Sequence, residues 1–308
     1  MGKAVMSDKS PEAGVLTPLE NDLACVLAPN PSPMTYWGTN TYLLGHENLA
    51  IIDPGPNDPK HLEALVTAIA GRRVSHILVT HSHLDHSPLA RPLADVTGAP
   101  ILAFGDSSTG RSEIMTRLAA SGQMGGGEGV DHAFQPDVIL ASGDKIEGDG
   151  WKLSALHTPG HFGNHMCFLW GDAAFCGDHL MGWASSLVSP PDGDLTDFMS
   201  SCHALAATGV TRGYSAHGAP INDAQTRLSD LISHRLMRES EIILALEHAP
   251  ADPLTLTKAI YKDVPEALFP MAQRNVLAHL IDLTARDRAR PFGGPNAPLT
   301  ANSKFTLI

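Results

Sequence analysis

The segment Thr80-His81-Ser82-His83-Leu84-Asp85-His86 constrains this chain more than any other feature. It follows Val74 to Val79, a short apolar run typical of a strand that is buried on both faces. The loop that leaves the carboxyl end of such a strand is where α/β folds place their sites. With 16 histidines in 308 residues, a His-x-His-x-Asp-His pattern is expected by chance only about 0.003 times in a chain of this length. The segment therefore predicts a site in an α/β fold.

The residue types in this segment indicate a metal site with two ions. Neutral imidazole is a good zinc ligand, and alternate residues on an extended loop can direct His81 and His83 at one ion. Asp85 and His86 then face a different point, which favours a second ion. Two neighbouring cations can share a water and lower its pKa toward about 7. The competing interpretation is a solvated polar loop.

Composition excludes several classes of protein. The net charge is −12, which argues against a surface that coats nucleic acid, because such binding uses many Lys and Arg contacts to phosphate. No apolar run reaches the length of a membrane span, and residues 1–16 lack the pattern of a secretory signal. The four cysteines show no close-pair spacing, so neither a disulfide scaffold nor a cysteine zinc knuckle is indicated. We expect a cytoplasmic enzyme.

The hydrophobic pattern predicts alternating strands and helices, then a helical end. Residues 1–20 read as a poorly ordered lead-in and residues 105–143 as an irregular insert around three glycines. A helix at 224–248 is expected to connect two domains, residues 1–222 and 223–308. The remaining expected strands are 39–44, 49–52, 100–103, 153–156, 166–170 and 173–176, and the remaining helices are 60–70, 254–264 and 266–285, followed by a Gly/Pro-rich end.

Three further segments resemble the ligand loops of the metallo-β-lactamase superfamily. They are Thr158-Pro159-Gly160-His161, Gly177-Asp178-His179 and Ser215-Ala216-His217-Gly218. The resemblance implies a four-layer αββα sandwich holding two zinc ions, with iron or manganese as alternatives. It implies that Asp178 bridges the ions, that His81, His83 and His161 hold one, and that Asp85, His86 and His217 hold the other. Members of the family usually carry proline or glycine where this chain has Ala216, a change in loop stiffness but in no ligand.

The resemblance narrows to the branch that contains β-lactamase-like protein 2. The entry segment 30–43, Ile52-Asp53-Pro54-Gly55 and the connector Ser233-His234-Arg235 carry it. This branch has a small C-terminal helical domain of the winged-helix type, and one relative is a single-strand endoribonuclease. The resemblance therefore implies a hydrolase in which a metal-bridging hydroxide, oriented by Asp85 as the catalytic residue, attacks the substrate.

The substrate is open at this point. A small acyl ester, thioester or lactone is favoured over RNA, because the body of the chain is acidic. The alternatives are the endoribonuclease, a mononuclear iron oxygenase on the same fold, and a non-catalytic nucleic-acid-binding module. We expect the insert and the connector helix to form the walls of the pocket. We expect no association with a membrane, and the apolar tail helices could form a homodimer.

Several other residues have both a functional and a structural interpretation. Asp53 and Thr80 are candidates to orient ligands by hydrogen bonds; the structural alternatives are an aspartate that only forms a turn and a threonine that is only solvated. For His165 a contact with the site and a structural role are weighed equally, whereas His157, His179 and Cys176 are expected to be structural. Trp183 is a candidate pocket wall at even odds with a core residue. His234, Arg235 and Arg238 either meet an anionic substrate group or, as favoured, form a solvated or interdomain face.

Overall fold

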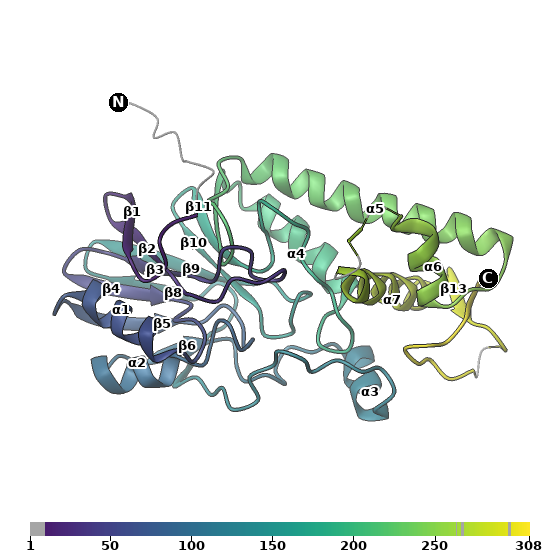
Figure 1. Ribbon diagram of the computed structural model, residues 1–308, viewed down its shortest axis with the longest axis horizontal. Helices are drawn as coiled ribbons and strands as arrows, with labels where there is room; N and C mark the ends of the chain where they lie inside the picture. Colours follow the sequence, from purple (N-terminus) through teal and green to yellow (C-terminus); the bar gives the residue numbers. More distant parts are fainter. Residues whose placement is uncertain (1–9, 263, 266–267, 295–296) are drawn as a thin grey trace.

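A computed structural model of the chain describes residues 10–262, 264–265, 268–294 and 297–308. Two β-sheets lie face to face, with helices on both outer surfaces, and a helical domain lies at one end (Figure 1). The predicted αββα sandwich is confirmed. No helix in these described ranges is both long enough and apolar enough to cross a membrane.

The first sheet has seven strands in sequential order, β1 to β7. Its central strands β4 and β5 pair in parallel; β4 is almost wholly buried, whereas in β5 Val74, Ile77 and Leu78 are buried and the other residues are half-buried or exposed. In the chain, α1 lies between β4 and β5, α2 between β5 and β6, and α3 between β6 and β7. The bounds are β1 (Leu16–Glu20), β2 (Leu23–Leu27), β3 (Asn40–Leu44), β4 (Asn48–Ile52), α1 (Pro59–Ile69), β5 (Arg73–Leu78), α2 (Ala90–Thr97), β6 (Ile101–Ala103), α3 (Glu113–Ser121) and β7 (Val138–Ile139).

The second sheet has five strands in the order β12-β11-β10-β9-β8. The central core lies between the two sheets and contains aromatic side chains such as Tyr42, Phe168 and Phe175. A second apolar layer packs α1 and α2 on the first sheet, and a third packs the helices α4 and α5 on the second. The bounds are β8 (Lys145–Gly148), β9 (Trp151–His157), β10 (Met166–Trp170), β11 (Ala173–Gly177), α4 (Leu195–Ala207), β12 (Arg212–Ser215) and α5 (Ala224–His248).

The C-terminal region has an apolar core of its own. The far end of α5 packs there with two further helices and a small hairpin. The hairpin contains Phe305, which is fully buried. Helix α7 also reaches back to the insert, where Met115 and Leu118 of α3 contact Leu277 and Ile281. The bounds are α6 (Pro253–Ile260), α7 (Phe269–Ala285), β13 (Ala289–Pro291) and β14 (Phe305–Leu307).

Two regional predictions were wrong, and a third region holds structure for which no prediction was made. The lead-in at 1–20 contains β1, which is half-exposed and forms by pairing with β2; residues 1–9 lie outside the described part. The insert at 105–143 is not irregular throughout, because Ser112 caps α3 and β7 joins the sheet. The Gly/Pro-rich end forms β13 and β14, although positions 295–296 are not described. Elements α2, α4, β2, β8 and β12 were not predicted.

The other predicted elements lie where the hydrophobic pattern placed them, within a few residues. Helix α5 has the predicted bounds, with Asp223 accepting a hydrogen bond from the Thr226 amide at its start. The helices predicted at 254–264 and 266–285 correspond to α6 and α7, and the predictions for positions 263, 266 and 267 fall outside the described residues. The division into residues 1–222 and 223–308 remains a prediction.

Candidate metal centre

The predicted ligands all follow the carboxyl ends of strands at one edge of the two sheets. The motif loop leaves β5, while His161, Asp178 and His217 follow β9, β11 and β12. The structure brings all of these side chains together. Their nitrogen and oxygen atoms form two groups in which every atom lies within 4.8 Å of the others in its group. The first group is His81, His83, His161 and Asp178, and the second is Asp85, His86 and His217.

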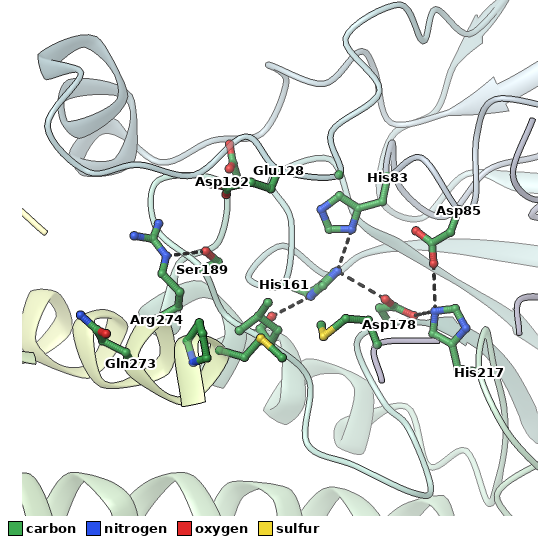
Figure 2. A pocket seen from close by; sticks show the side chains of 15 residues that line it. His83, Asp85, Glu128, His161, Asp178, Ser189, Asp192, His217, Gln273 and Arg274 are labelled. Carbon is green, nitrogen blue, oxygen red and sulfur yellow. Dashed lines mark hydrogen bonds and ion pairs between the residues drawn. The ribbon is translucent and has the colours of Figure 1, made fainter. Parts of the chain in front are cut away.

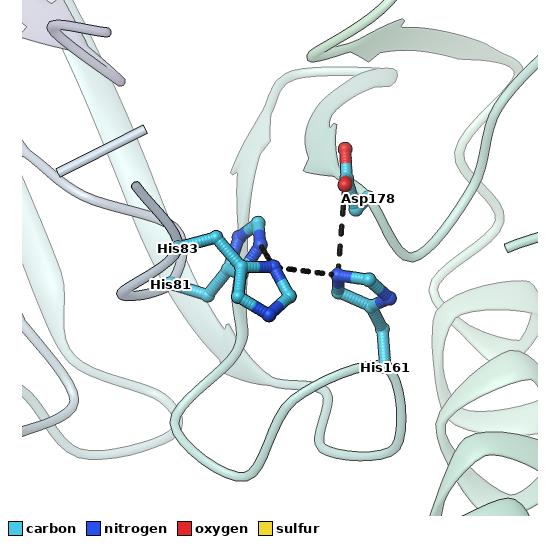
Figure 3. Close-up of side chains that lie close together, drawn as sticks. All are labelled: His81, His83, His161 and Asp178. Carbon is cyan, nitrogen blue, oxygen red and sulfur yellow. Dashed lines mark hydrogen bonds and ion pairs between the residues drawn. The ribbon is translucent and has the colours of Figure 1, made fainter. Parts of the chain in front are cut away.

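In the first group, three imidazole nitrogens face one another (Figure 3). His83 Nδ1 lies 2.8 Å from His81 Nε2 and 3.1 Å from His161 Nε2. The Asp178 carboxylate closes the group, with its Oδ2 3.5 Å from His161 Nε2. Three nitrogens and one carboxylate oxygen form a donor set that suits zinc.

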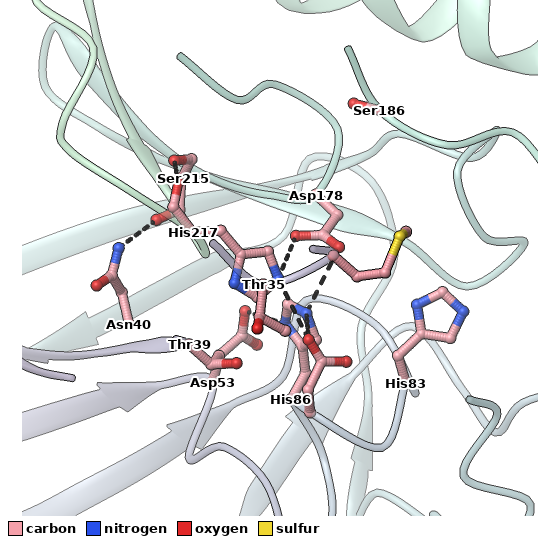
Figure 4. A network of polar contacts seen from close by, with 12 residues as sticks. Thr35, Thr39, Asn40, Asp53, His83, His86, Asp178, Ser186, Ser215 and His217 are labelled. Carbon is pink, nitrogen blue, oxygen red and sulfur yellow. Dashed lines mark hydrogen bonds and ion pairs between the residues drawn. The ribbon is translucent and has the colours of Figure 1, made fainter. Parts of the chain in front are cut away.

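In the second group, Asp85 lies between two imidazoles. Its Oδ2 is 3.4 Å from His86 Nε2 and 3.2 Å from His217 Nε2. Asp178 reaches this group as well, because its Oδ1 lies 3.3 Å from His217 Nε2 and its Oδ2 lies 3.7 Å from His86 Nε2 (Figure 4). Asp178 therefore contacts both groups, which is the position that a bridging ligand requires.

The far nitrogen of each histidine whose Nε2 faces the cluster is engaged elsewhere. His161 Nδ1 lies 2.7 Å from the Leu187 carbonyl oxygen, and His217 Nδ1 lies 3.0 Å from the Gly38 carbonyl oxygen. A carbonyl can only accept, so both rings carry a proton on Nδ1 and turn Nε2 toward the cluster as the atom that an ion would bind. The loop of His217 is also tied to the first sheet, because the Asn40 amide donates to the Ala216 carbonyl at 2.7 Å. This bond fixes the backbone of the loop at Ala216, directly before His217.

Asp53 is a hub that orients two of the histidines. Its Oδ2 lies 3.0 Å from His86 Nδ1 and accepts from Thr80 Oγ1 at 2.7 Å, and its Oδ1 accepts from the Thr80 amide at 2.7 Å. Thr80 Oγ1 in turn lies 3.1 Å from His81 Nδ1. Asp53 is only 2% exposed and has a left-handed backbone, with φ 51°. The hypothesis that Asp53 and Thr80 orient ligands is confirmed by these contacts.

Burial and neighbouring charges separate the histidines into two classes. Burial lowers the pKa of His81 and His161, and it lowers the pKa of His83 to about 3. These rings are neutral at pH 7 and offer lone pairs. For His217 burial also acts downward, but the carboxylates of Asp178 and Asp85 outweigh it and raise the pKa to about 10.

His86 behaves like His217. Burial lowers its pKa, but Asp85, Asp178 and Asp53 raise it well above the usual range. In the metal-free chain, the protons on His86 and His217 therefore neutralise the carboxylates of this group. A cation bound there would take the place of those protons.

The side chains fit metal ions better than they fit one another. In the first group three ring nitrogens meet within 2.8 and 3.1 Å of His83 Nδ1, and the neutral rings carry at most one proton between them on that atom, so at least two lone pairs point at the same place. Among the described residues, His86 Nε2 and Asp178 Oδ1 are buried and find no hydrogen-bond partner. Both atoms face the cluster, where a bound ion would supply the partner that each of them lacks.

A cavity of about 550 Å³ opens directly onto both groups (Figure 2). One wall is the insert at Glu128 and Gly129, where the Leu84 amide donates to the Gly129 carbonyl. The opposite wall is the first turns of α7. The expectation that the connector helix forms a wall was wrong, because α7 lies between α5 and the cavity. The lining residues are Met34, His83, Asp85, Glu128, Gly129, His161, Asp178, Leu187, Ser189, Asp192, His217, Pro270, Met271, Gln273 and Arg274.

Sequence reasoning missed Gln273 and Arg274, which bring polar groups to the end of the cavity away from the cluster. Arg274 Nε donates to Ser189 Oγ at 2.8 Å, and one Nη donates to the Met124 carbonyl. No local signal marks these residues, because their place depends on how α7 docks on the insert. The apolar residues Leu277 and Ile281, one and two turns further along α7, were the available hint that this face is buried.

Of the other weighed histidines, His157, His165 and His179 are structural. His165 is fully buried, with Nδ1 2.8 Å from Thr158 Oγ1, and its Nε2 accepts from the Asp178 amide at 3.2 Å. It therefore supports the backbone of Asp178 rather than a substrate. His157 stacks on Phe104 with ring centroids 3.6 Å apart, and His179 packs against Phe198. These contacts confirm the expectation for His157 and His179.

The structure also shows the surroundings of the cysteine, tryptophan and arginine residues for which two interpretations were given. Cys176 is fully buried in β11, as expected of a small apolar residue. Trp183 stacks on Tyr36 at 4.8 Å instead of lining the cavity, so that suggestion was wrong. Arg235 is buried and donates to Asn275 of α7 and to the Ser186 carbonyl, so the expectation of a solvated face was wrong for this residue. Arg238 pairs with Glu241 and lies over the ring of Tyr261.

Comparison with known families agrees with this geometry. The family model of the metallo-beta-lactamase superfamily matches residues 34–208, and that of the beta-lactamase associated winged helix domain matches residues 253–293. The chain therefore belongs to the metallo-beta-lactamase superfamily and carries the winged-helix domain associated with it. The predicted family, its fold and its class of metal-dependent hydrolases are confirmed.

Individual relatives cover different parts of the chain. Lactamase-like protein adaB of Aspergillus niger is 32% identical over 73% of this chain, and the match spans 64% of that protein's length. The Beta-lactamase-like protein 2 homolog of Caenorhabditis elegans is 30% identical over 84% of this chain and 82% of its own. The Atrochrysone carboxyl ACP thioesterase of Aspergillus fumigatus is 31% identical over 81% of this chain and 71% of its own.

The fold is also found among solved structures. A beta-lactamase domain protein from Burkholderia ambifaria superimposes with a TM-score of 0.79 at 20% identity, covering 98% of this chain and 96% of its own. The likeness therefore includes the C-terminal helices as well as the sandwich.

Proposed function

We propose that this protein is a dinuclear zinc-dependent hydrolase of small acyl thioesters, esters or lactones. His81, His83 and His161 would hold one ion, Asp85, His86 and His217 the other, and Asp178 would contact both. Bound zinc would supply Lewis acidity and a water acidic enough to act as a nucleophile at neutral pH. Iron and manganese are the alternative metals for the same donors.

Asp85 is the residue that we assign a catalytic role. Burial raises the pKa of its carboxyl, but His86 and His217 lower it well below the usual range, so the group is ionised. Its side chain is 27% exposed, the most open of the carboxylates in the cluster, and it lines the cavity. An ionised carboxylate there accepts a hydrogen bond from the attacking water and so orients it toward the substrate.

The cavity is the single observation that carries the choice of substrate. Its volume of about 550 Å³ lies within the range of small-molecule sites. Met34, Leu187 and Met271 give it an apolar lining that suits an acyl chain. Relatives named as thioesterases of an acyl carrier protein support a thioester as the bond that is cleaved.

Single-stranded RNA is the second candidate, favoured by the match to a winged-helix domain. The net charge of −12 opposes it, as do Glu128 and Asp192 in the cavity lining, because phosphate contacts require basic side chains. Salt separates the two candidates. A single-stranded RNA bound through six or more phosphate contacts would lose affinity by about 300-fold or more between 50 and 200 mM salt, whereas a thioester would respond little.

The test is a panel of acyl-CoA thioesters, lactones, nitrocefin and single-stranded RNA with zinc-loaded protein. We expect thioester cleavage, and we expect His83→Ala to lose at least about a hundred-fold in rate, since a ligand is removed. Full activity of His83→Ala on the substrate that reacts would contradict the proposal. A cytoplasmic location and a homodimer through the tail helices remain predictions.

A further inference from the structure

The segment 186–189 lies between the metal centre and the C-terminal helices. On the side of the metal centre, the Leu187 carbonyl oxygen lies 2.7 Å from His161 Nδ1. His161 directs its Nε2 into the first group, so the position of this carbonyl sets the direction of the ligand atom. Leu187 therefore acts on the cluster through its backbone and not through its side chain.

On the other side, α5 and α7 hold the two residues that flank Leu187. The Val188 amide donates to Asn275 Oδ1 at 3.1 Å. The same oxygen accepts from Arg235 Nη1 at 2.9 Å, and the second Nη of Arg235 donates to the Ser186 carbonyl. Residues 186 and 188 are thus fixed by one connected set of hydrogen bonds.

Burial makes this set rigid. Arg235 is 2% exposed and lies over the ring of Phe198, with its guanidinium carbon 5.1 Å from the centroid. If a buried guanidinium loses a hydrogen-bond acceptor, its desolvation is no longer compensated and the fold is destabilised. Movement of Asn275 or Ser186 away from Arg235 is therefore unfavourable. Arg274, the neighbour of Asn275 on α7, adds a third contact through Ser189 Oγ (Figure 2).

We propose that Asn275 and Arg235 are positioning residues that set the orientation of His161 through the segment 186–189. The C-terminal domain is then part of the support of the metal centre, in addition to forming one wall of the cavity. Loss of the Asn275 acceptor releases the Val188 amide and Arg235 together, and the Leu187 carbonyl loses its fixed place. This inference rests on the proposed metal-binding function.

The test compares three variants by zinc affinity, measured by competition with a chromophoric chelator. Asn275→Leu removes the acceptor at similar volume, and we expect one of the two ions to bind about ten-fold more weakly. Asn275→Asp keeps an acceptor oxygen for both donors and should retain affinity within about two-fold. Thr196→Val is the matched control, because it removes a hydrogen bond of 2.7 Å between α4 and Asp282 of the same helix α7 without touching 186–189.

A second readout needs no metal. In the metal-free protein, nitrogen NMR should show His161 held as the Nδ1–H tautomer in the wild type, Asn275→Asp and Thr196→Val, and a tautomer mixture in Asn275→Leu. Asn275→Ala removes the same acceptor and replaces Asn275→Leu in both measurements if the leucine variant does not fold.

The outcomes separate the two proposals. Unchanged zinc affinity and an unchanged tautomer in Asn275→Leu, or an equal loss in Thr196→Val, would overturn the positioning role alone. A wild-type chain that binds no zinc would overturn the proposed function, and with it this inference.

Discussion

Replacing Asp53 by asparagine should weaken metal binding at the second group through a change of tautomer. In the wild type, Asp53 Oδ2 accepts from His86 Nδ1, so Nε2 is the nitrogen that faces the cluster and that gives up its proton when an ion binds. If the asparagine carbonyl keeps the bond to the Thr80 amide, its NH₂ group takes the place of Oδ2. That NH₂ donates to His86 Nδ1 and drives the proton to Nε2, the atom that would bind the ion.

The magnitude follows from the contacts that are lost. To bind an ion in the variant, His86 must carry its proton on Nδ1, and this N–H then faces the NH₂ group of the asparagine, which is also a donor. Relative to the wild type, the ion-bound state therefore lacks the hydrogen bond from His86 Nδ1 to a carboxylate, which is worth about 1.5–3 kcal/mol. At 1.36 kcal/mol per decade, this corresponds to a loss of about ten- to a hundred-fold in affinity at one of two sites. The structure of the metal-free chain should be retained, because the Thr80 amide keeps its acceptor.

The assay is competition for zinc with a chelator, together with metal content after dialysis. Asp194→Asn is the matched control: Asp194 is 7% exposed and caps α4, a position where asparagine serves equally well. We expect one tightly held ion in Asp53→Asn and two in Asp194→Asn and the wild type. Two ions held with wild-type affinity in Asp53→Asn would refute the role of Asp53 as the hub that sets the tautomers.

Three further predictions follow from the structure. Zinc binding to the metal-free chain at pH 7.5 should release about two protons, from His86 and His217, measured by calorimetry in buffers of different ionisation enthalpy; no release would contradict the raised pKa values of these residues. Gly177→Ala should lower the free energy of unfolding of the metal-free chain, measured in urea, by about 3 kcal/mol, because the new Cβ would lie 2.5 Å from His165 Nε2 and 2.7 Å from Thr80 Oγ1. Gly209→Ala is the control: it also has a positive φ but lies in open space, so it should cost about 1 kcal/mol. Burial, with a smaller contribution from Asp194, raises the pKa of Asp197 to about 6, so ionisation of this carboxyl destabilises the fold as pH rises from about 4 to 6. Discounted for the partial exposure of the group, Asp197→Asn should raise the free energy of unfolding by about 1 kcal/mol at pH 7 and leave it unchanged at pH 4, as measured by thermal unfolding. An equal gain at both pH values would exclude ionisation as the cause.

The part of the site that could be predicted from residues alone is the motif loop. His81, His83, Asp85 and His86 lie within six residues, so their convergence needs only one loop after one buried strand. His161, Asp178 and His217 lie about 80 to 130 residues further on. Spacing cannot show that such residues meet, and only the family resemblance predicted it.

The residues around the ligands were less accessible to prediction. Asp53 could be proposed because it follows the strand that pairs with β5. Arg274 and Asn275 could not, because their role depends on the docking of α7 against the insert and the segment 186–189. Interfaces of this kind leave only an apolar helical pattern in the sequence, which does not say what the helix packs against.

The missed strands have a similar cause. β1 alternates between exposed and half-buried residues and depends on pairing with β2 for its structure. β7 has only two residues, both exposed, at the edge of the sheet. Neither has the buried, apolar character by which β5 could be recognised.

Metal content with anomalous diffraction from crystals of the purified protein tests the central claim most directly. The account predicts two zinc ions per chain, one between His81, His83 and His161, the other between Asp85, His86 and His217, with Asp178 in contact with both. No bound ion, or a single iron on three ligands, would contradict it.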